Sequence, residues 1–371
     1  MLIRVVREPR PGERRVALVP RGAAALVTSG HRVVVPPGVG MDAGMTDEAY
    51  IAAGAEISDG APAADVVVGV GPLTLDDVGP TKAVIGFLDP LGAPAEIARF
   101  AEAGITALAL ELIPRSTLAQ SMDALSSQAT SAGYEAVLLG AFALPRFLPM
   151  MMTAAGTVRP ARVLVLGAGV AGLQAIATAR RLGAIVSGYD IRPAAREQVE
   201  SLGAKFVGGP VVAAAEQAGG YAAEVDEETR RQQQDALAAA VAESDLIITT
   251  AQVQGRRAPL LITAAMVSSM KPASVIIDLA APTGGNCELT SPGEVVAHFG
   301  VAIHGPEDLA RNTAGDASEM YSRNVLSLIT HLTHDGSLVI GPDDEIATST
   351  CVARGGKVTD ERVLAALEGR V

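Results

Sequence analysis

Residues 161–190 read ARVLVLGAGVAGLQAIATARRLGAIVSGYD, a pattern that predicts a strand, a tight turn, a helix and a second strand. The turn carries glycines with the spacing of a dinucleotide-binding loop. Gly167 permits the tight turn, Gly169 lets a pyrophosphate approach the backbone, and Gly172 allows the helix to pack closely on the strand. The unpaired N–H groups at the start of the helix attract the anion. The loop residues expected at this Rossmann-type site are Gly167, Ala168, Gly169 and Val170.

Asp190 ends the second strand, where a carboxylate accepts hydrogen bonds from the adenosine ribose hydroxyls. An ionised Asp190 repels the 2′-phosphate of NADP, so the sequence favours NAD(H) as the cofactor. The neighbouring Ile191 and Arg192 are expected at the same site. Because Arg192 and Arg196 could neutralise a phosphate, NADP use stays an alternative.

Short apolar strands alternate with helical stretches along the chain, which is the rhythm of parallel sheets. In the N-terminal third of the chain, the expected strands are residues 3–8, 31–37, 64–70, 82–88 and 105–112. After the long helix that follows, they are residues 161–167, 184–190, 204–207, 245–253, 273–280 and 301–305. Periodic apolar positions predict long helices at residues 121–148 and 318–331.

The predicted fold class is α/β, with two Rossmann-like parallel-sheet domains separated by a cleft and joined by long helices. Strand-like residues 337–340 (SLVI) indicate that the C-terminal segment returns to the first domain, which is then discontinuous. The first domain is expected to comprise residues 1–122 and 312–371. The NAD(H)-binding Rossmann domain is expected to comprise residues 123–311.

Charge and composition exclude several classes of partner. The chain has 29 Lys and Arg against 41 Asp and Glu, a formal net charge of -12, which disfavours nucleic acid and anionic lipid. Cys287 and Cys351 are far apart in sequence, as is typical of a reducing compartment. The N-terminus lacks the apolar core of a signal peptide, and the most apolar stretch, residues 136–158, contains two prolines and an arginine. We expect a cytoplasmic chain without direct membrane insertion.

Three stretches of the sequence resemble a known family. They are ELIPRSTLAQSMDALSSQATSAGYEAVLLGA (111–141), MMTAAGTVRPARVLVLGAGVAGLQAIATARRLGA (151–184) and IIDLAAPTGGNC (276–287). They resemble the NAD(H)-binding domain of proton-translocating transhydrogenases, relatives of the alanine dehydrogenases, and REPRPGERRVALVP (7–20) fits as well. The most specific stretch is residues 115–127, because no general rule of folding requires this pattern.

The resemblance implies roles for several side chains. Arg115, Asp123 and Ser126 would hold the nicotinamide end of the cofactor, and Gln120 would face a second nucleotide carried by a partner subunit. The candidate catalytic residues are therefore Gln120, Arg115 and Asp123. From the residues alone, Asp123 and Ser126 share a helix face, and an ordinary capping cluster is the alternative.

Residues 213–244 (AAAEQAGGYAAEVDEETRRQQQDALAAAVAES) predict a loop that leads into a polar surface helix. The resemblance implies that Gly220 and Tyr221 lie on a loop that closes over NAD(H), with Gln233 on the following helix. A solvated loop with one tyrosine is the alternative. Val253, at the end of a later predicted strand, completes the expected cofactor contacts.

The sequence is poor in groups for dehydrogenase chemistry. Alanine dehydrogenases carry a substrate-binding lysine and a catalytic histidine, but the matching places here hold Gly69 and a segment without histidine, residues 87–89. Arg15 matches their substrate-carboxylate arginine and is interpreted as a structural relic. His331 and His334 share a helix face without a third ligand, so no metal site is expected.

Direct hydride transfer between two nicotinamides requires neither an acid nor a base, and proximity is most of the catalytic task. The resemblance implies NADP(H) on a partner subunit, membrane-spanning subunits that couple the transfer to proton translocation, and a homodimer. It places the chain in the cytoplasm, peripheral on the inner face of the membrane through those partner subunits. The alternatives are an alanine dehydrogenase-like amino acid dehydrogenase and a catalytically silent NAD(H)-binding protein.

Overall fold

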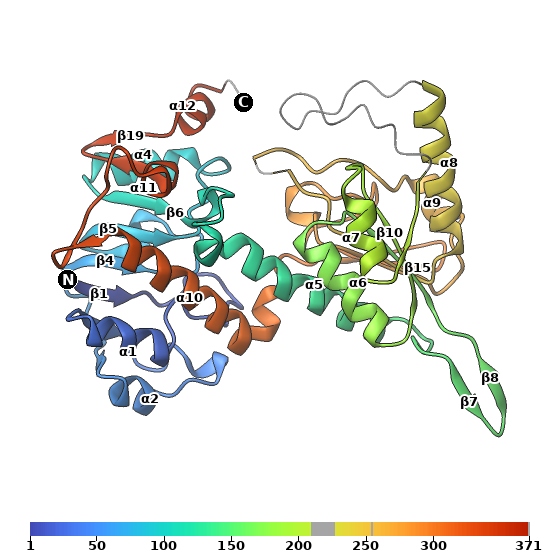
Figure 1. The fold of residues 1–371 in the computed structure, drawn as a ribbon, viewed down its shortest axis with the longest axis horizontal. Helices are drawn as coiled ribbons and strands as arrows, with labels where there is room; N and C mark the ends of the chain where they lie inside the picture. Colours follow the sequence, from blue (N-terminus) through green and yellow to red (C-terminus); the bar gives the residue numbers. More distant parts are fainter. Residues whose placement is uncertain (209–226, 254, 370–371) are drawn as a thin grey trace. The chain divides into compact units, whose positions relative to one another are not determined.

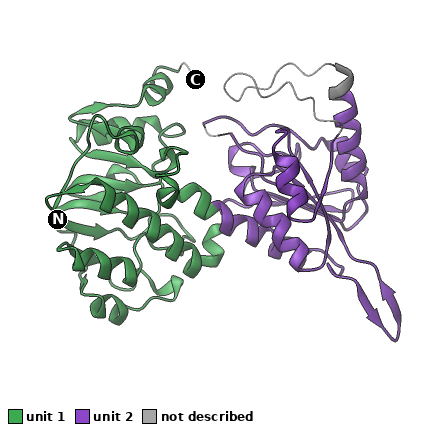
Figure 2. Cartoon of the chain, in the orientation of Figure 1, with its two compact units in different colours: residues 1–128, 310–371 green, residues 129–309 purple. Residues whose placement is uncertain are grey.

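The computed structural model describes residues 1–208, 227–253 and 255–369. The chain divides into two compact units, residues 1–128 with 310–371 and residues 129–309 (Figure 2). The sequence predicts the corresponding boundaries after residues 122 and 311. The chain passes from the first unit to the second within one long helix, α5 (Ala124–Ala143).

The first unit is built on an eight-stranded sheet in the order β19-β18-β6-β5-β4-β1-β2-β3 (Figure 1). The strands from β3 to β6 are parallel, whereas β18 is antiparallel to β6 and to β19. The bounds are β1 (Leu2–Val5), β2 (Arg32–Val35), β3 (Glu56–Ile57), β4 (Ala64–Val68), β5 (Thr81–Gly86), β6 (Thr106–Ala109), β18 (Cys351–Arg354) and β19 (Lys357–Val358). The six parallel strands therefore have the order of a dinucleotide-binding fold, with its switch point between β1 and β4.

Helices cover both faces of this sheet. In β4, Val66 and Val68 point to one face and Val67 to the other, and all three are fully buried. The side of Val66 packs on α1 (Pro20–Thr28), α10 (Ala314–Leu332) and α11 (Glu345–Thr350). The side of Val67 packs on α4 (Pro94–Glu102) and α12 (Glu361–Leu367). The remaining elements are α2 (Asp47–Ala52), α3 (Leu75–Val78), β16 (Thr333–His334), β17 (Ser337–Leu338) and the 3-10 turns η1 (Met41–Ala43), η2 (Leu110–Leu112), η3 (Gln120–Met122) and η6 (Ala310–Thr313).

The second unit repeats the same strand order around its own seven-stranded sheet, β11-β10-β9-β12-β13-β15-β14. All neighbours are parallel except β14, which is antiparallel to β15. The bounds are β9 (Arg162–Leu166), β10 (Ile185–Tyr189), β11 (Lys205–Phe206), β12 (Leu246–Thr249), β13 (Val275–Asp278), β14 (Val295–His298) and β15 (Val301–His304). The helices are α6 (Val170–Arg181), α7 (Ala195–Ser201), α8 (Glu227–Glu243), α9 (Ala264–Ser268) and the 3-10 turn η5 (Ala281–Thr283). Its switch point lies between β9 and β12, directly beside the glycine-rich turn.

A hairpin of β7 (Met151–Thr153) and β8 (Gly156–Val158) projects from the second unit (Figure 1). Its strand residues are all exposed, and the Met152 side chain is 75% exposed. The hairpin follows α5, which ends at Ala143, before Pro145. Among the described residues, no helix has the length and apolar character needed to cross a membrane.

Candidate functional site

The glycine-rich turn of the second unit is shaped by close backbone contacts. Gly167 has φ +95°, and a Cβ atom there would lie 2.7 Å from Thr250 Oγ1. A Cβ atom on Gly172 would lie only 1.8 Å from the carbonyl oxygen of Gly167, so the helix rests directly on the turn. A Cβ atom on Gly169, in contrast, would meet nothing within 4 Å. Gly167 and Gly172 are therefore required by packing, whereas Gly169 faces open space.

The first turn of α6 is available to an anion. Gly169 precedes the helix and supplies no side chain to cap it, and its carbonyl accepts the first bond of the helix, from the N–H of Leu173 at 2.8 Å. Backbone N–H groups at such a helix start, together with the helix dipole, bind phosphates. Val170 is 43% exposed beside them. The open space at Gly169 thus lies where a pyrophosphate would bind.

Asp190 lies directly after β10 and is fixed by hydrogen bonds on both oxygens. Oδ2 accepts from the Ala168 N–H at 2.7 Å and from Arg192 Nη2 at 3.0 Å. Oδ1 accepts from the Arg192 N–H at 2.8 Å and from Arg192 Nε at 3.0 Å. These bonds use about four acceptor directions, the capacity of a carboxylate. A ribose hydroxyl would therefore have to displace the exposed Arg192 side chain.

The charge of Asp190 follows from the same contacts. Burial acts to raise the pKa of this carboxyl, but the hydrogen bonds from Arg192 and Ala168 and the charge of Arg192 outweigh it and lower the pKa below its ordinary value. Asp190 is thus ionised at neutral pH. Ile191 beside it is 77% exposed.

The first unit contains the second group of predicted site residues, in and around η3. Arg115 and Gln120 are exposed, and Asp123 and Ser126 are half-buried. Asp123 precedes α5, accepting at Oδ1 from the Ser126 N–H (2.9 Å) and at Oδ2 from the Ser126 hydroxyl (2.6 Å). This is the geometry of a helix cap. The structure therefore brings Asp123 and Ser126 together, in the arrangement that the capping alternative predicts.

The remaining predicted contacts lie in the second unit. Val253 follows β12 and is 51% exposed, and Gln233 is half-buried on α8. Gly220 and Tyr221 lie outside the described residues. The residues around Gly167, Ala168 and Asp190 are thus in one described group of this unit.

Polar residues on α10 escaped the sequence analysis. The buried Asn324 donates from Nδ2 to the carbonyl of Ser121 at 2.9 Å and accepts from the Ser127 hydroxyl at 2.7 Å. The fully buried Tyr321 hydroxyl donates to the carbonyl of Gly69 at 2.8 Å. The sequence signal was a run of polar side chains on the apolar face of an amphipathic helix, because a buried polar group needs a partner.

The switch point of the first sheet is occupied by the chain's own charged groups. Arg15 forms an ion pair with Glu13, with Nη2 and Oε2 2.7 Å apart and both side chains only 2% exposed. Arg15 also donates from Nε to Glu13 Oε1 at 2.8 Å and from Nη1 to Gln128 Oε1 at 2.9 Å. At the neighbouring strand end, Glu8 accepts from the N–H groups of Val70 (2.7 Å) and Gly71 (3.0 Å). Charged donors and acceptors here are thus committed within the chain.

Glu111 at this edge provides a pH-dependent prediction. Its Oε1 accepts from the N–H groups of Leu88 (2.9 Å) and Asp89 (2.6 Å). Burial raises its pKa from 4.5 to about 7, against the opposing effect of these hydrogen bonds. Because the folded pKa is the higher one, this stabilisation is complete below pH 4.5 and is lost as pH rises through about 7. At about 1.4 kcal/mol per unit of pKa difference, the loss is about 3 kcal/mol.

The Glu111→Gln variant keeps an amide oxygen for both N–H groups but does not ionise in this range. We expect its free energy of unfolding to fall by about 3 kcal/mol less between pH 4.5 and pH 8 than that of the unmodified chain. Denaturant titration at the two pH values measures the difference. Glu8, whose pKa burial also raises to about 7, is present in both proteins and cancels. An equal fall in both proteins would contradict the prediction.

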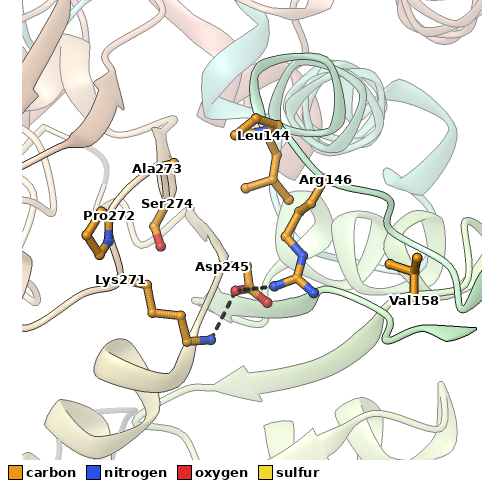
Figure 3. A pocket seen from close by; sticks show the side chains of 9 residues that line it. Leu144, Arg146, Val158, Asp245, Lys271, Pro272, Ala273 and Ser274 are labelled. Carbon is orange, nitrogen blue, oxygen red and sulfur yellow. Dashed lines mark hydrogen bonds and ion pairs between the residues drawn. The ribbon is translucent and has the colours of Figure 1, made fainter. Parts of the chain in front are cut away.

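A pocket of about 350 Å³ lies in the second unit at the amino ends of β12 and β13 (Figure 3). Arg146 Nη1 and Lys271 Nζ converge on Asp245 Oδ1, at 2.8 and 3.0 Å. Oδ2 of Asp245 accepts from the Arg162 N–H at 2.8 Å. The glycine-rich turn is at the carboxyl end of the same sheet, so this charge cluster is separate from that site. In the described ranges, no group of three or more His, Cys, Asp or Glu could hold a metal ion.

Two α/β sheets with this strand order, one of which carries a glycine-rich turn and a following acid, define a two-domain protein of the nucleotide-binding Rossmann type. Sequence comparison specifies the family. Residues 4–132 match the alanine dehydrogenase/PNT N-terminal domain, and residues 136–361 match the alanine dehydrogenase/PNT C-terminal domain. The chain belongs to the alanine dehydrogenase/PNT family, which confirms the resemblance indicated by its sequence.

Three relatives show where the chain lies within this family. It is 48% identical to the first portion of NAD(P) transhydrogenase subunit alpha, a separate chain in Rhodospirillum rubrum, over 96% of this chain and 97% of that one. The crystal structure of transhydrogenase from Sinorhizobium meliloti matches with a TM-score of 0.88 and 43% identity, over 96% of this chain and 100% of that one. The structure of an L-alanine dehydrogenase matches with a TM-score of 0.83 but only 26% identity, over 100% of both chains. The two-domain parallel-sheet fold is therefore the one that the sequence predicts.

Proposed function

We propose that this chain is the NAD(H)-binding component of a proton-translocating transhydrogenase. NADH bound here passes a hydride to NADP⁺ bound on a partner subunit, and membrane-spanning subunits couple that step to proton translocation. The observation that carries the proposal is the 48% identity to the Rhodospirillum rubrum transhydrogenase alpha chain, over almost the whole length of both chains.

The geometry of the second unit supports NAD(H) as the cofactor. The pyrophosphate would bind at the open start of α6, beside Gly169, and the adenosine ribose at Asp190. An ionised Asp190 disfavours the 2′-phosphate of NADP(H). Arg192 then moves from Asp190 to admit the ribose. Its guanidinium, freed from the carboxylate, would flank the adenosine together with Ile191.

The reaction needs position more than acid or base. A hydride leaves C4 of the NADH nicotinamide and bonds to C4 of the NADP⁺ nicotinamide, which oxidises the first ring and reduces the second without releasing a proton. Orientation and proximity therefore supply most of the rate. We infer that Arg115, Asp123 and Ser126 hold the nicotinamide end and that Gln120 faces the partner's nucleotide. The exposure of Arg115 and Gln120 leaves both side chains accessible to such ligands.

An alanine dehydrogenase-like activity is the second candidate, and the first unit argues against it. Arg15, which would bind a substrate carboxylate, already binds the carboxylate of Glu13. A Cβ atom at Gly69, where a substrate lysine is expected, would lie 2.5 Å from Val6 Cγ1 and 2.7 Å from Leu73 Cδ1. Neither side chain for an amino acid substrate is therefore available there.

The assembly is proposed on the same basis. We infer a homodimer that binds an NADP(H)-carrying subunit and membrane-spanning subunits, and a place in the cytoplasm on the inner face of the membrane. The chain inserts no segment of its own into the bilayer, and it binds no nucleic acid. The exposed methionines of the β7–β8 hairpin are consistent with a protein contact.

Mixing the chain with its NADP(H)-binding partner subunit tests the function. Hydride transfer from NADH to an NADP⁺ analogue with a distinct absorbance is expected, and its absence would contradict the proposal. NADH oxidation with pyruvate and ammonia would instead favour the dehydrogenase. NADH binding without transfer, even with all partners present, would favour a silent binding protein.

The Asp190→Ala variant links that activity to the site. Losing charge-assisted hydrogen bonds to the ribose should weaken NADH binding by about 10- to 100-fold. The matched control is Asp360→Ala, because Asp360 pairs with Arg362 in the same manner, with Oδ1 accepting the Arg362 N–H at 2.8 Å and Oδ2 accepting Nη2 at 2.7 Å. Asp360 caps α12 in the other unit, so its loss should leave the NADH dissociation constant unchanged. Calorimetric titration with NADH measures both.

A further inference from the structure

A buried carboxylate at the end of β13 has no place in the function proposed so far. Asp278 is fully buried and is the last residue of the strand. Within the described ranges of the chain it forms no ion pair. Five donors instead surround its carboxylate: Thr249 Oγ1 at 2.7 Å, the Ala280 N–H at 3.0 Å, the Asn286 N–H at 2.9 Å, the Cys287 N–H at 3.1 Å and Thr290 Oγ1 at 2.7 Å. Asp278 thereby fixes the loop that carries Asn286.

Asn286 connects this loop to the segment after β12. Its side chain is fully buried and bonds to backbone groups. Oδ1 accepts from the Ala251 N–H at 3.0 Å, while Nδ2 donates to the carbonyls of Ala251 and Pro259, each at 2.8 Å. Both polar backbone groups of Ala251 are therefore bound by one amide side chain, which fixes the orientation of the backbone there.

Ala251 and Thr250 form the wall against which the glycine-rich turn packs. A Cβ atom on Gly167 would lie 3.0 Å from the Ala251 nitrogen and 2.7 Å from Thr250 Oγ1. The Thr250 hydroxyl also donates to the Gly167 carbonyl at 3.0 Å. The same carbonyl lies against Gly172 at the start of α6. Hydrogen bonds and close contacts thus run without a break from Asp278 to the turn.

We propose that Asp278 and Asn286 are positioning residues for nucleotide binding: they hold Thr250 and Ala251 in place and, through this wall, keep the glycine-rich turn in its open form. The inference rests on the proposed binding of NAD(H). Neither side chain is expected to contact the nucleotide, because both are buried beneath the wall. Hydrogen bonds to a pyrophosphate depend steeply on direction, so a shift of the wall weakens binding.

The Asn286→Ala variant tests the proposal by NADH titration and by transfer assays with the partner subunit. The dissociation constant and the KM for NADH should rise about 10-fold, the equivalent of about one broken hydrogen bond. The rate at saturating NADH should stay within about twofold, because the reacting ring is not held by this wall. A lower rate at saturation with an unchanged KM would overturn the proposal.

Ser274→Ala is the matched control for a general loss of stability. Ser274 is 2% exposed at the amino end of the same strand, and its hydroxyl donates to the Ser244 carbonyl at 3.2 Å. This variant loses a buried hydrogen bond at the opposite edge of the sheet and should bind NADH normally. Equal weakening in the Ser274 and Asn286 variants would overturn the proposal.

A milder pair of variants decides the question if the Asn286→Ala protein does not fold. Thr290→Val removes one donor to Asp278 at nearly constant shape, and Thr290→Ser keeps that donor. The valine variant should bind NADH several-fold more weakly, and the serine variant should bind as the unmodified chain does. Equal binding by both would overturn the inference. Failure of the unmodified chain to bind NADH would instead overturn the proposed function.

Discussion

The Gly172→Ala variant is expected to bind NADH about 100-fold more weakly than the unmodified chain. The added methyl group would lie 1.8 Å from the carbonyl oxygen of Gly167, a separation that no side-chain rotation relieves. The backbone of the turn, or the whole start of α6, must move. Either shift misaligns the N–H groups that would bind the pyrophosphate, each of which contributes about 1.5 to 3 kcal/mol to a charged acceptor. Overpacking of this kind also costs about 1 to 3 kcal/mol of stability.

Two other glycines separate the effect on binding from the effect on stability. In Gly169→Ala the methyl group meets nothing within 4 Å, so unfolding should stay within about 0.5 kcal/mol of normal while the pyrophosphate is obstructed. In Gly341→Ala, in the other unit, the nearest atom to the methyl group is Asp344 Cβ at 3.7 Å, and neither property should change. NADH titration together with denaturant unfolding measures all three variants. Normal binding by Gly172→Ala would refute the packing argument.

The Glu13→Ala variant should lower the free energy of unfolding by about 3 to 5 kcal/mol. Both partners of the Glu13–Arg15 pair are 2% exposed, so the substitution leaves a buried guanidinium with its main counter-charge removed. Burial acts to raise the pKa of Glu13, but the bonds and charge of Arg15 outweigh it and lower that pKa. Because the folded pKa is the lower one, the stabilisation is present above the unfolded pKa and is lost as pH falls through the folded one.

An exposed pair in the same unit is the control for Glu13. Arg32 and Glu56 are 3.1 Å apart, with side chains 72% and 57% exposed, and Glu56→Ala should cost less than about 1 kcal/mol. The double variant Glu13→Met with Arg15→Met removes both charges and should recover most of the lost stability, since the single variant suffers from an unpaired charge. Denaturant unfolding at pH 7 gives all the values. A loss for Glu13→Ala no larger than that for Glu56→Ala would contradict the burial argument.

The local features of the fold could be predicted from the sequence. The strand, glycine turn, helix and second strand of residues 161–190 correspond to β9, α6 and β10, because each depends on side chains within a few positions. The long helix predicted at 318–331 is present as α10. The α/β class with two parallel sheets follows from the alternation of these elements.

Several elements could not be predicted because they are short and gain stability only from distant partners. The sequence indicates residues 337–340 as the returning strand, but β17 (Ser337–Leu338) pairs only with β16. The strand that joins the first sheet is β18, which pairs with β6. The exposed β7–β8 hairpin and the antiparallel β14 were likewise absent from the sequence prediction. Strands of two to four residues carry too little periodicity to be recognised.

The sequence by itself determined the glycine spacing, the acid after the second strand and the family, because these depend on residue types at fixed short separations. Only the tertiary structure decided which polar groups support them. Asn286 reaches Ala251 across 35 residues, and Tyr321 reaches Gly69 across 252. It also decided that Arg15 is bound by Glu13 and not free for a ligand. Such pairings arise when buried polar groups must find partners in the folded chain, and sequence spacing carries no record of them.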